Sequence, residues 1–192
     1  MVRVTRIMGI AGLIICLVLM YTTDHGIPGI IKFDSSFRLL DMRFHYNSEA
    51  VQQCFEQIGA GGRTAYLSIL ILDFVFIACL LITMLTITKA AVTLPRIRTT
   101  LYIVCVLRAI LDILENCFLL SMLNRYPVFS TSAANLCSWF TTFKFIMLCL
   151  WLLVLVARGL STLVQKSTSP KIWTEPRRID TNKEPCRRDS KD

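Results

Sequence analysis

LYIVCVLRAILDILENCFLLSML (residues 101–123) is the stretch that decides the fold, because it is apolar enough to cross a membrane and yet holds Arg108, Asp112, Glu115 and Asn116. A spanning helix needs roughly 17–25 residues. Each ionisable side chain at mid-bilayer depth costs roughly 2.5–3.5 kcal/mol on insertion scales. We therefore expect these side chains to find partners inside a helix bundle or in a hydrated cavity.

The composition of the chain favours a membrane protein. Its 192 residues are 54% hydrophobic and have a mean hydropathy of +0.57, which suits one compact domain that is too apolar for an ordinary soluble protein. The net charge of +8 comes from basic residues at the ends of apolar segments and in the C-terminal tail, not from a basic face of a soluble module. We therefore expect membrane lipid and other membrane proteins as partners, and no nucleic acid.

Three further apolar segments join the first, at about residues 5–23, 65–88 and 138–162, and the span around residues 101–123 extends over about 99–123. The sequence thus predicts an all-α fold, an integral membrane four-helix bundle within a domain of residues 1–164. Arg3 and Arg6 precede the first segment, which suits either a signal anchor or a cleaved signal peptide. The absence of a good small-residue cleavage site favours the anchor, and cleavage stays an alternative.

Residues 24–63 are the long polar region between the first two segments, and we expect a small ordered cap there. Asn47 and Gly59 delimit a short helix in which Val51, Phe55 and Ile58 form an apolar stripe. The IPGI sequence at residues 27–30 is typical of a turn. The glycines at positions 59, 61 and 62 predict a flexible corner before the second span.

The distribution of basic residues predicts the orientation. With both termini inside, Arg3, Arg6, Lys89, Arg96, Arg98 and Arg158 all face the cytoplasm, as the positive-inside rule requires. The cap and residues 124–137 then lie on the outer or lumenal side of an endomembrane or plasma membrane. Residues 165–192 have too little apolar surface to fold alone, so we expect a disordered basic cytoplasmic tail.

The cysteines and histidines indicate neither a metal site nor a cofactor. The eight Cys residues form no CxxC pair and no Cys/His ligand spacing. His25 and His45 both lie outside the spans. Cys54 and Cys137 fall in the two outer loops, where an oxidising compartment would allow a disulfide between them. Two unpaired thiols are the alternative.

The charged residues of different spans fall at one depth. At 1.5 Å per residue, Asp73, Glu115, Asn116 and Lys144 all lie roughly 9–14 Å below the outer surface. Arg108 precedes Asp112 by four residues, so these two can pair on one helix face. We expect Lys144 to pair with Glu115 or with Asp73, because an unpaired ammonium in hydrocarbon would be neutral or excluded. Arg63 at the rim supplies a third base.

This intramembrane network supports two interpretations. In the leading one, the protein is not an enzyme, and the network orders the bundle and binds a lipid headgroup or a partner. In the alternative, a small membrane enzyme or proton-coupled transporter uses Asp73, Asp112, Glu115 and Lys144. No nucleophile elbow, phosphate-binding loop or zinc helix motif occurs, so we assign no catalytic residue.

Several short motifs resemble a family of small, uncharacterised four-span membrane proteins. They are YNSE at 46–49, GRTAY at 62–66, Asp73, DILEN at 112–116 and FKF at 143–145. The Asp-x-x-Glu-Asn with its downstream Lys is the most specific part, and the likeness covers about residues 40–150. Ile58 stands where Leu is usual, and Arg108 is an addition to the pattern. The resemblance implies a four-span fold and brings no activity.

Overall fold

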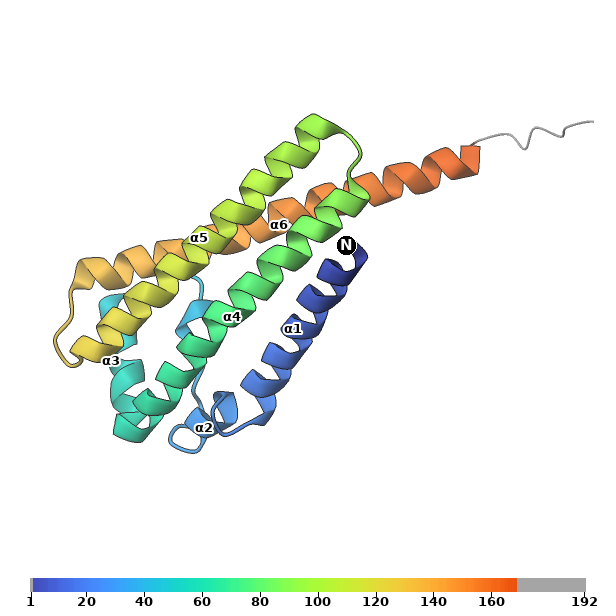
Figure 1. Cartoon of the computed structure of the whole chain (residues 1–192). Coiled ribbons are helices and arrows are strands. Elements are labelled where there is room, and N and C mark those ends of the chain that lie inside the picture. The colour runs from blue at the N-terminus through green and yellow to red at the C-terminus, as the bar shows by residue number, and fades with distance from the viewer. Residues whose placement is uncertain (1, 169–192) are drawn as a thin grey trace, which may run out of the picture.

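The chain is all-helical in the computed structural model, which describes residues 2–168, and no strand occurs in that part. This confirms the all-α prediction. The structure has four long helices (Figure 1): α1 (Val2–Thr22), α4 (Gly59–Ala91), α5 (Pro95–Arg125) and α6 (Thr131–Thr168). Three short elements lie between α1 and α4, namely α2 (Ile27–Ile31), the 3-10 helix η1 (Leu40–Met42) and α3 (Ser48–Gln57).

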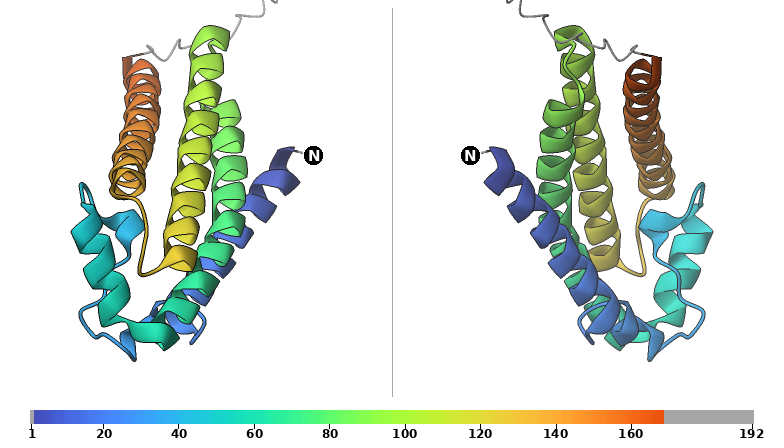
Figure 2. Two further views of the ribbon diagram at one scale, coloured as in Figure 1. Left: turned by 90° about the vertical axis from the view of Figure 1, so that its left-hand side faces the viewer. Right: turned by 90° about the vertical axis from the view of Figure 1, so that its right-hand side faces the viewer.

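The long helices lie side by side in the order α1, α4, α5, α6 (Figure 2). Helix α4 packs against α1 and α5, and α5 packs against α6. The cap formed by residues 24–58 lies at one end of this row, where it contacts α4 and α6. The two outer helices of the row, α1 and α6, thus flank one face that α4 and α5 form from behind.

Three segments are long and apolar enough to cross a membrane: Arg3–Ile31, Gly59–Ala91 and Thr131–Ser161. These contain α1, α4 and α6. Helix α5 does not meet the same criterion, since Arg108, Asp112 and Glu115 interrupt its apolar sequence. Length and composition therefore support three of the four spans that we predicted.

The local signals in the cap explain most of its helix boundaries. The Asn47 side chain accepts a hydrogen bond from the Ala50 N–H at 3.0 Å, which caps the start of α3. Gly59, the first residue of α4, has φ +61°, a conformation that glycine adopts without steric cost. The predicted short helix is thus confirmed.

Two local predictions for the cap are wrong. Helix α4 already begins at Gly59, so Gly61 belongs to a helix and not to a flexible corner; a Cβ there would lie 2.5 Å from the Phe33 ring. Residues 27–30 do not form a simple turn, since they begin the one-turn helix α2 with a proline in its first turn. Proline is favoured at that position because its nitrogen needs no hydrogen-bond partner there.

The cap is packed onto the ends of the long helices. Its residues Leu40, Val51 and Phe55 are fully buried in an apolar cluster with Tyr66 of α4 and Leu119 of α5. A second apolar cluster lies at the other end, with members that include Met84, Leu101, Cys105 and Trp151. The buried charged residues of α4, α5 and α6 form a polar layer between the two clusters, namely Asp73, Arg108, Asp112, Glu115 and Lys144.

The predicted cytoplasmic tail lies largely outside the described residues. Helix α6 continues to Thr168, so residues 165–168 of that tail belong to a helix. Residues 169–192 are not described.

Candidate functional site

Asp112 on α5 is the centre of a buried ion cluster. Its Oδ2 lies 2.7 Å from Arg108 Nη2, and its Oδ1 lies 2.7 Å from Lys144 Nζ on α6. Lys144 Nζ also lies 2.7 Å from Glu115 Oε2. The four side chains are at most 7% exposed. Two carboxylates and two cations thus satisfy one another, which lowers the cost of burying them.

Thr141 binds the second carboxylate oxygen of Glu115, and sequence analysis missed this residue. Its hydroxyl donates to Glu115 Oε1 at 2.5 Å, while Cys137 Sγ donates to the Glu115 carbonyl at 3.5 Å. Thr141 precedes Lys144 by three residues, so the two side chains lie on the same face of α6. That spacing is the sequence signal that would have identified it.

Asp73 on α4 joins the layer through an amide and not through a base. Asn116 Nδ2 donates to Asp73 Oδ2 at 2.6 Å, which links α4 to α5. Within residues 2–168, Asp73 has no ion pair. Of the two partners expected for Lys144, the structure pairs it with Glu115, and it adds Asp112.

Arg63 lies outside the ion cluster, contrary to the expectation of a third base facing the acids. Its Nη1 donates to the Phe55 carbonyl at 2.9 Å, and its guanidinium lies 4.3 Å from the centroid of the Tyr126 ring. Arg63 therefore joins the cap helix α3 to the loop after α5.

The candidate disulfide between Cys54 and Cys137 is not formed, since both are free thiols. Cys54 is buried in the apolar cluster of the cap, and this burial raises the pKa of its thiol to about 11. Cys137 faces Glu115 on α5 through the contact described above. Both thiols belong to the same apolar cluster, but they are not joined.

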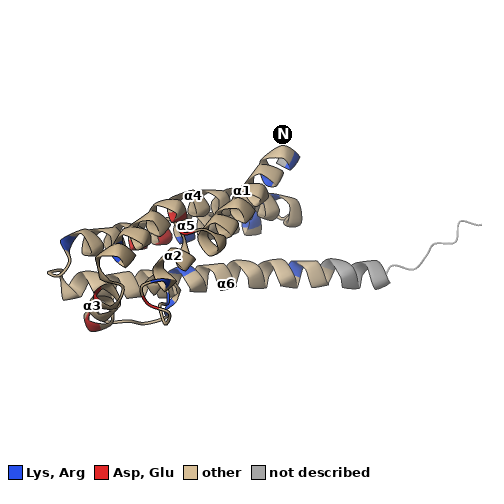
Figure 3. Cartoon of the chain, turned by 90° about the horizontal axis from the view of Figure 1, so that it is seen from below, with Lys and Arg blue, Asp and Glu red and all other residues tan. Residues whose placement is uncertain are grey.

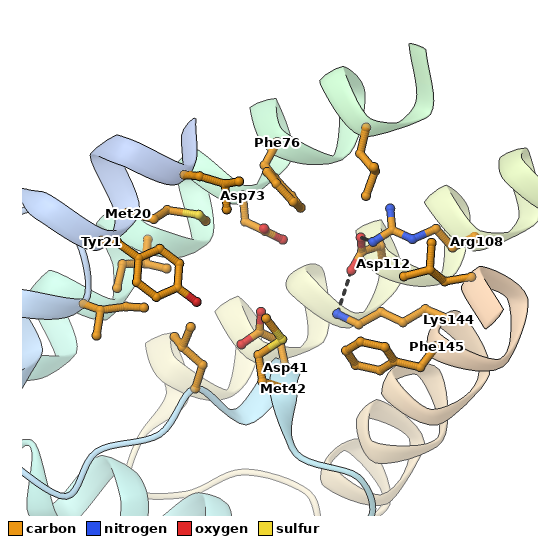
Figure 4. Close-up of a pocket in the computed structure, with 16 residues that line it drawn as sticks. Met20, Tyr21, Asp41, Met42, Asp73, Phe76, Arg108, Asp112, Lys144 and Phe145 are labelled. Atoms are coloured by element: carbon orange, nitrogen blue, oxygen red, sulfur yellow. Dashed lines mark hydrogen bonds and ion pairs between the residues drawn. The ribbon is translucent and has the colours of Figure 1, made fainter. Parts of the chain in front are cut away.

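A cavity of about 170 Å³ opens beside the ion cluster (Figure 4). Helices α1 and α6 supply opposite walls, and α4, α5, α2 and η1 complete it. Tyr21, Met42 and Leu17, which are 56%, 55% and 42% exposed, place its mouth between α1 and the cap. Most of the wall is apolar, and its polar side chains are Tyr21, Asp41, Asp73, Arg108, Asp112 and Lys144.

Asp41 is the second residue that sequence analysis missed. It lies on η1 and points into the cavity (Figure 4). Its Oδ1 is buried and has no hydrogen-bond partner among residues 2–168. Burial raises the pKa of the Asp41 carboxyl, and the nearby Lys144 ammonium opposes part of this rise. A lone acid between two large apolar residues, Leu40 and Met42, is the sequence signal for this position.

The cavity and the ion cluster together hold more acids than bases. Four carboxyl groups, on Asp41, Asp73, Asp112 and Glu115, meet two cations, on Arg108 and Lys144. When all are ionised, the excess is two negative charges. Further groups have unused bonding capacity, since Arg108 Nε, Arg108 Nη1 and Asn116 Oδ1 are buried without a partner in the described part of the chain.

No group of three or more His, Cys, Asp or Glu side chains in residues 2–168 is arranged to hold a metal ion. In comparisons with known proteins, no family model, no curated protein and no solved structure matches the chain.

Proposed function

We propose that the chain is a multi-pass membrane protein in which α1, α4, α5 and α6 all span the bilayer as a four-helix bundle. The surface of α5 supports its inclusion with the three apolar helices. Its exposed residues at the level of the charges are Val106, Leu107, Ile110, Ile113 and Leu114, whereas the charged side chains of that level are buried. Lipid chains around α5 would thus contact an apolar surface.

We further propose that both termini face the cytoplasm. The beginning of α1, the α4–α5 loop and the end of α6 lie at one end of the helices, opposite the cap (Figure 2). Basic residues occur at that end, whereas every Asp and Glu of residues 2–168 lies in the cap or in the central layer (Figure 3). This division agrees with the positive-inside rule. Labelling of Cys186 by an impermeant reagent outside intact cells would contradict this orientation.

The function that the site supports best is binding of a membrane lipid, with the polar head beside the ion cluster. The observation that carries this proposal is the cavity itself, which combines apolar walls, an ionic interior and exposed residues at its mouth. Lipids have the same division into a polar head and an apolar tail. Ligand sites commonly have mostly apolar walls with a few polar groups that fix orientation.

A binding role is favoured over the enzyme or transporter that the sequence left open. Asp112, Glu115 and Lys144 are all held in ion pairs of 2.7 Å. An acid–base catalyst needs a group that can reach the substrate within hydrogen-bond distance. Side chains that are already held in ion pairs suit a rigid floor of the cavity better than a proton-transfer role. We therefore propose a non-enzymatic protein.

The proposal is tested by native mass spectrometry of the protein released from membranes in mild detergent. The wild type is expected to retain a bound lipid. Leu17→Trp places a larger side chain at the mouth and should abolish retention, whereas Leu19→Trp on the same helix should not. The two residues are similarly exposed, at 42% and 40%, but Leu19 does not line the cavity. Equal retention by both variants, or no lipid on the wild type, would refute lipid binding in this cavity.

A further inference from the structure

Asp41 and Asp73 enter the cavity from two different elements without a cation between them. Asp73 extends from α4 and Asp41 from η1, and both side chains are directed into the same space (Figure 4). Neither forms an ion pair with a base in residues 2–168. Asp112, by contrast, holds two cations on its two oxygens. The carboxyl groups of the site that lack a cation partner are therefore those of Asp41 and Asp73.

A ligand with a cationic group would supply the missing ion-pair partner. Burying a carboxylate without a partner is costly, and a ligand that pairs with it removes that cost. Aromatic rings next to the two acids suit an organic cation, since Tyr21 and Phe76 line the cavity and ring faces attract ammonium groups. Phe145 already has the Lys144 ammonium 5.6 Å from its centroid.

An ammonium group fits this cavity better than a metal ion. Calcium takes six to eight oxygen ligands, and magnesium requires a nearly ideal octahedron. The described residues offer no cluster of three such side chains, and most of the cavity wall is apolar. An ammonium group needs only acceptors for its few N–H bonds.

We propose that the cavity is selective for amphiphiles with an ammonium head, which Asp41 and Asp73 bind while the apolar tail leaves through the mouth between α1 and the cap. This inference rests on the proposed lipid-binding function and names the class of ligand.

The guanidinium of Arg108 narrows the class of ligand further. Arg108 uses Nη2 for Asp112, while its Nε and Nη1 have no partner in the described part of the chain. A neutral oxygen next to the ammonium, such as a hydroxyl, can accept from them. A phosphate would instead bring further negative charge to a site that already has an excess of carboxyl groups. The favoured ligand is therefore a long-chain amino alcohol.

The experiment uses three probes with the same chain: sphingosine, N-acetylsphingosine and sphingosine 1-phosphate. Acetylation removes the positive charge, and phosphorylation adds negative charge. The full-length protein in detergent is incubated with equal concentrations of the three, and native mass spectrometry gives the ratio of the bound forms. We expect a preference for sphingosine over the other two of roughly tenfold or more, the size of effect that one buried charge pair provides.

Variants then test the two acids. Asp41→Asn should reduce the preference to near unity, and it breaks no hydrogen bond of Oδ1 because that atom has no partner in residues 2–168. Asp73→Asn should do the same, although it also alters the bond with Asn116. Asp24→Asn is the matched control, since Asp24 lies in the cap, is exposed and pairs with Lys32 away from the cavity. The control should keep the full preference.

The results separate this inference from the proposed function. Equal binding of sphingosine and N-acetylsphingosine, blocked by Leu17→Trp, would overturn the ammonium selectivity and leave lipid binding intact. A preference that persists in both Asp41→Asn and Asp73→Asn would also overturn it. Binding that Leu17→Trp does not reduce for any of the three probes would refute the cavity as the site, and with it both proposals.

Discussion

Lys144 connects the acids of α5 to α6, and the free energy of unfolding of the protein should depend on this one ammonium. It lies 2.7 Å from oxygens of both Asp112 and Glu115. Removing one partner of a buried ion pair leaves the other charge without compensation, whereas replacing both can be nearly neutral. The pair Lys144–Glu115 therefore lends itself to a double-mutant cycle.

In that cycle we expect Lys144→Met and Glu115→Gln each to lower the free energy of unfolding by roughly 3–5 kcal/mol. The double variant should lose clearly less free energy of unfolding than the sum of the two single losses. With both side chains replaced, no charge of this pair remains buried without its partner. Equilibrium unfolding in mixed micelles measures all four proteins. Additive losses would show that the 2.7 Å contact does not couple the two residues energetically.

The buried carboxyl of Asp41 leads to a second prediction, which concerns how stability depends on pH. Because burial raises its pKa in the folded state, the folded protein binds a proton at Asp41 more tightly than the unfolded chain does. Stability is therefore lost as the pH rises from the ordinary carboxyl range, near 4, through the raised pKa of the folded state. Asp41→Asn should be more stable than the wild type at neutral pH, by on the order of 1 kcal/mol.

Thermal unfolding of this variant and the wild type across pH 4 to 8 tests the sign of that effect. The advantage of Asp41→Asn should shrink as the pH falls toward the ordinary carboxyl range, about 4. A variant that is less stable than the wild type at neutral pH would contradict the account. A gain in stability together with a loss of sphingosine preference would show that the acid serves binding at the expense of stability.

At the scale of elements, α1 is held close to α4 by small residues. A Cβ on Gly12 would lie 2.5 Å from Cys79 Sγ, and one on Gly9 would lie 2.7 Å from Thr83 Oγ1. Small residues allow membrane helices to approach closely. Because α1 forms one wall of the cavity, this contact also sets the width of the site.

We therefore expect Gly12→Ala to destabilise the protein by roughly 1–3 kcal/mol, the usual cost of overpacking, and to weaken lipid retention. Gly159→Ala is the matched control, because a Cβ there meets no atom within 4 Å. Cys79→Ala should rescue Gly12→Ala by making room for the added methyl group. Thermal unfolding and native mass spectrometry give both readouts. Equal effects of the two glycine substitutions would refute the close contact.

Some of the helices could be predicted from the sequence and others could not. The long helices and α3 follow from apolar length and from the cap at Asn47, which are local signals. Helices α2 and η1 could not be predicted from local sequence signals, because packing against the long helices stabilises them. The depth argument placed Lys144 and Glu115 at one level, but it did not distinguish Asp112 from Asp73 as the further partner, since that choice depends on how the helices are rotated.

Asp41 illustrates the same limit. The apolar neighbours Leu40 and Met42 are a local signal for this position, but they do not show what Asp41 faces; only the tertiary fold brings η1 into the cavity. Cys54 and Cys137 are the reverse case: chain position allowed a bridge, whereas the fold buries both in one apolar cluster as free thiols.

For the molecule as a whole, the parts combine into one arrangement. The row of helices exposes large apolar residues outward, such as Ile7 and Leu153. Its buried charged residues lie in a layer between two apolar clusters. The cap closes one end of the cavity and α1 and α6 flank it. The central claim is that a membrane lipid occupies this cavity.

Photocrosslinking tests this claim most directly. The protein is reconstituted with a lipid that carries a diazirine close to its head, irradiated and digested, and the adducts are mapped by mass spectrometry. The account predicts adducts on residues of the cavity wall from three elements, namely Met20 on α1, Met42 on η1 and Phe145 on α6. Adducts confined to outward residues such as Ile7 and Leu153, which are 65% and 66% exposed, would contradict it.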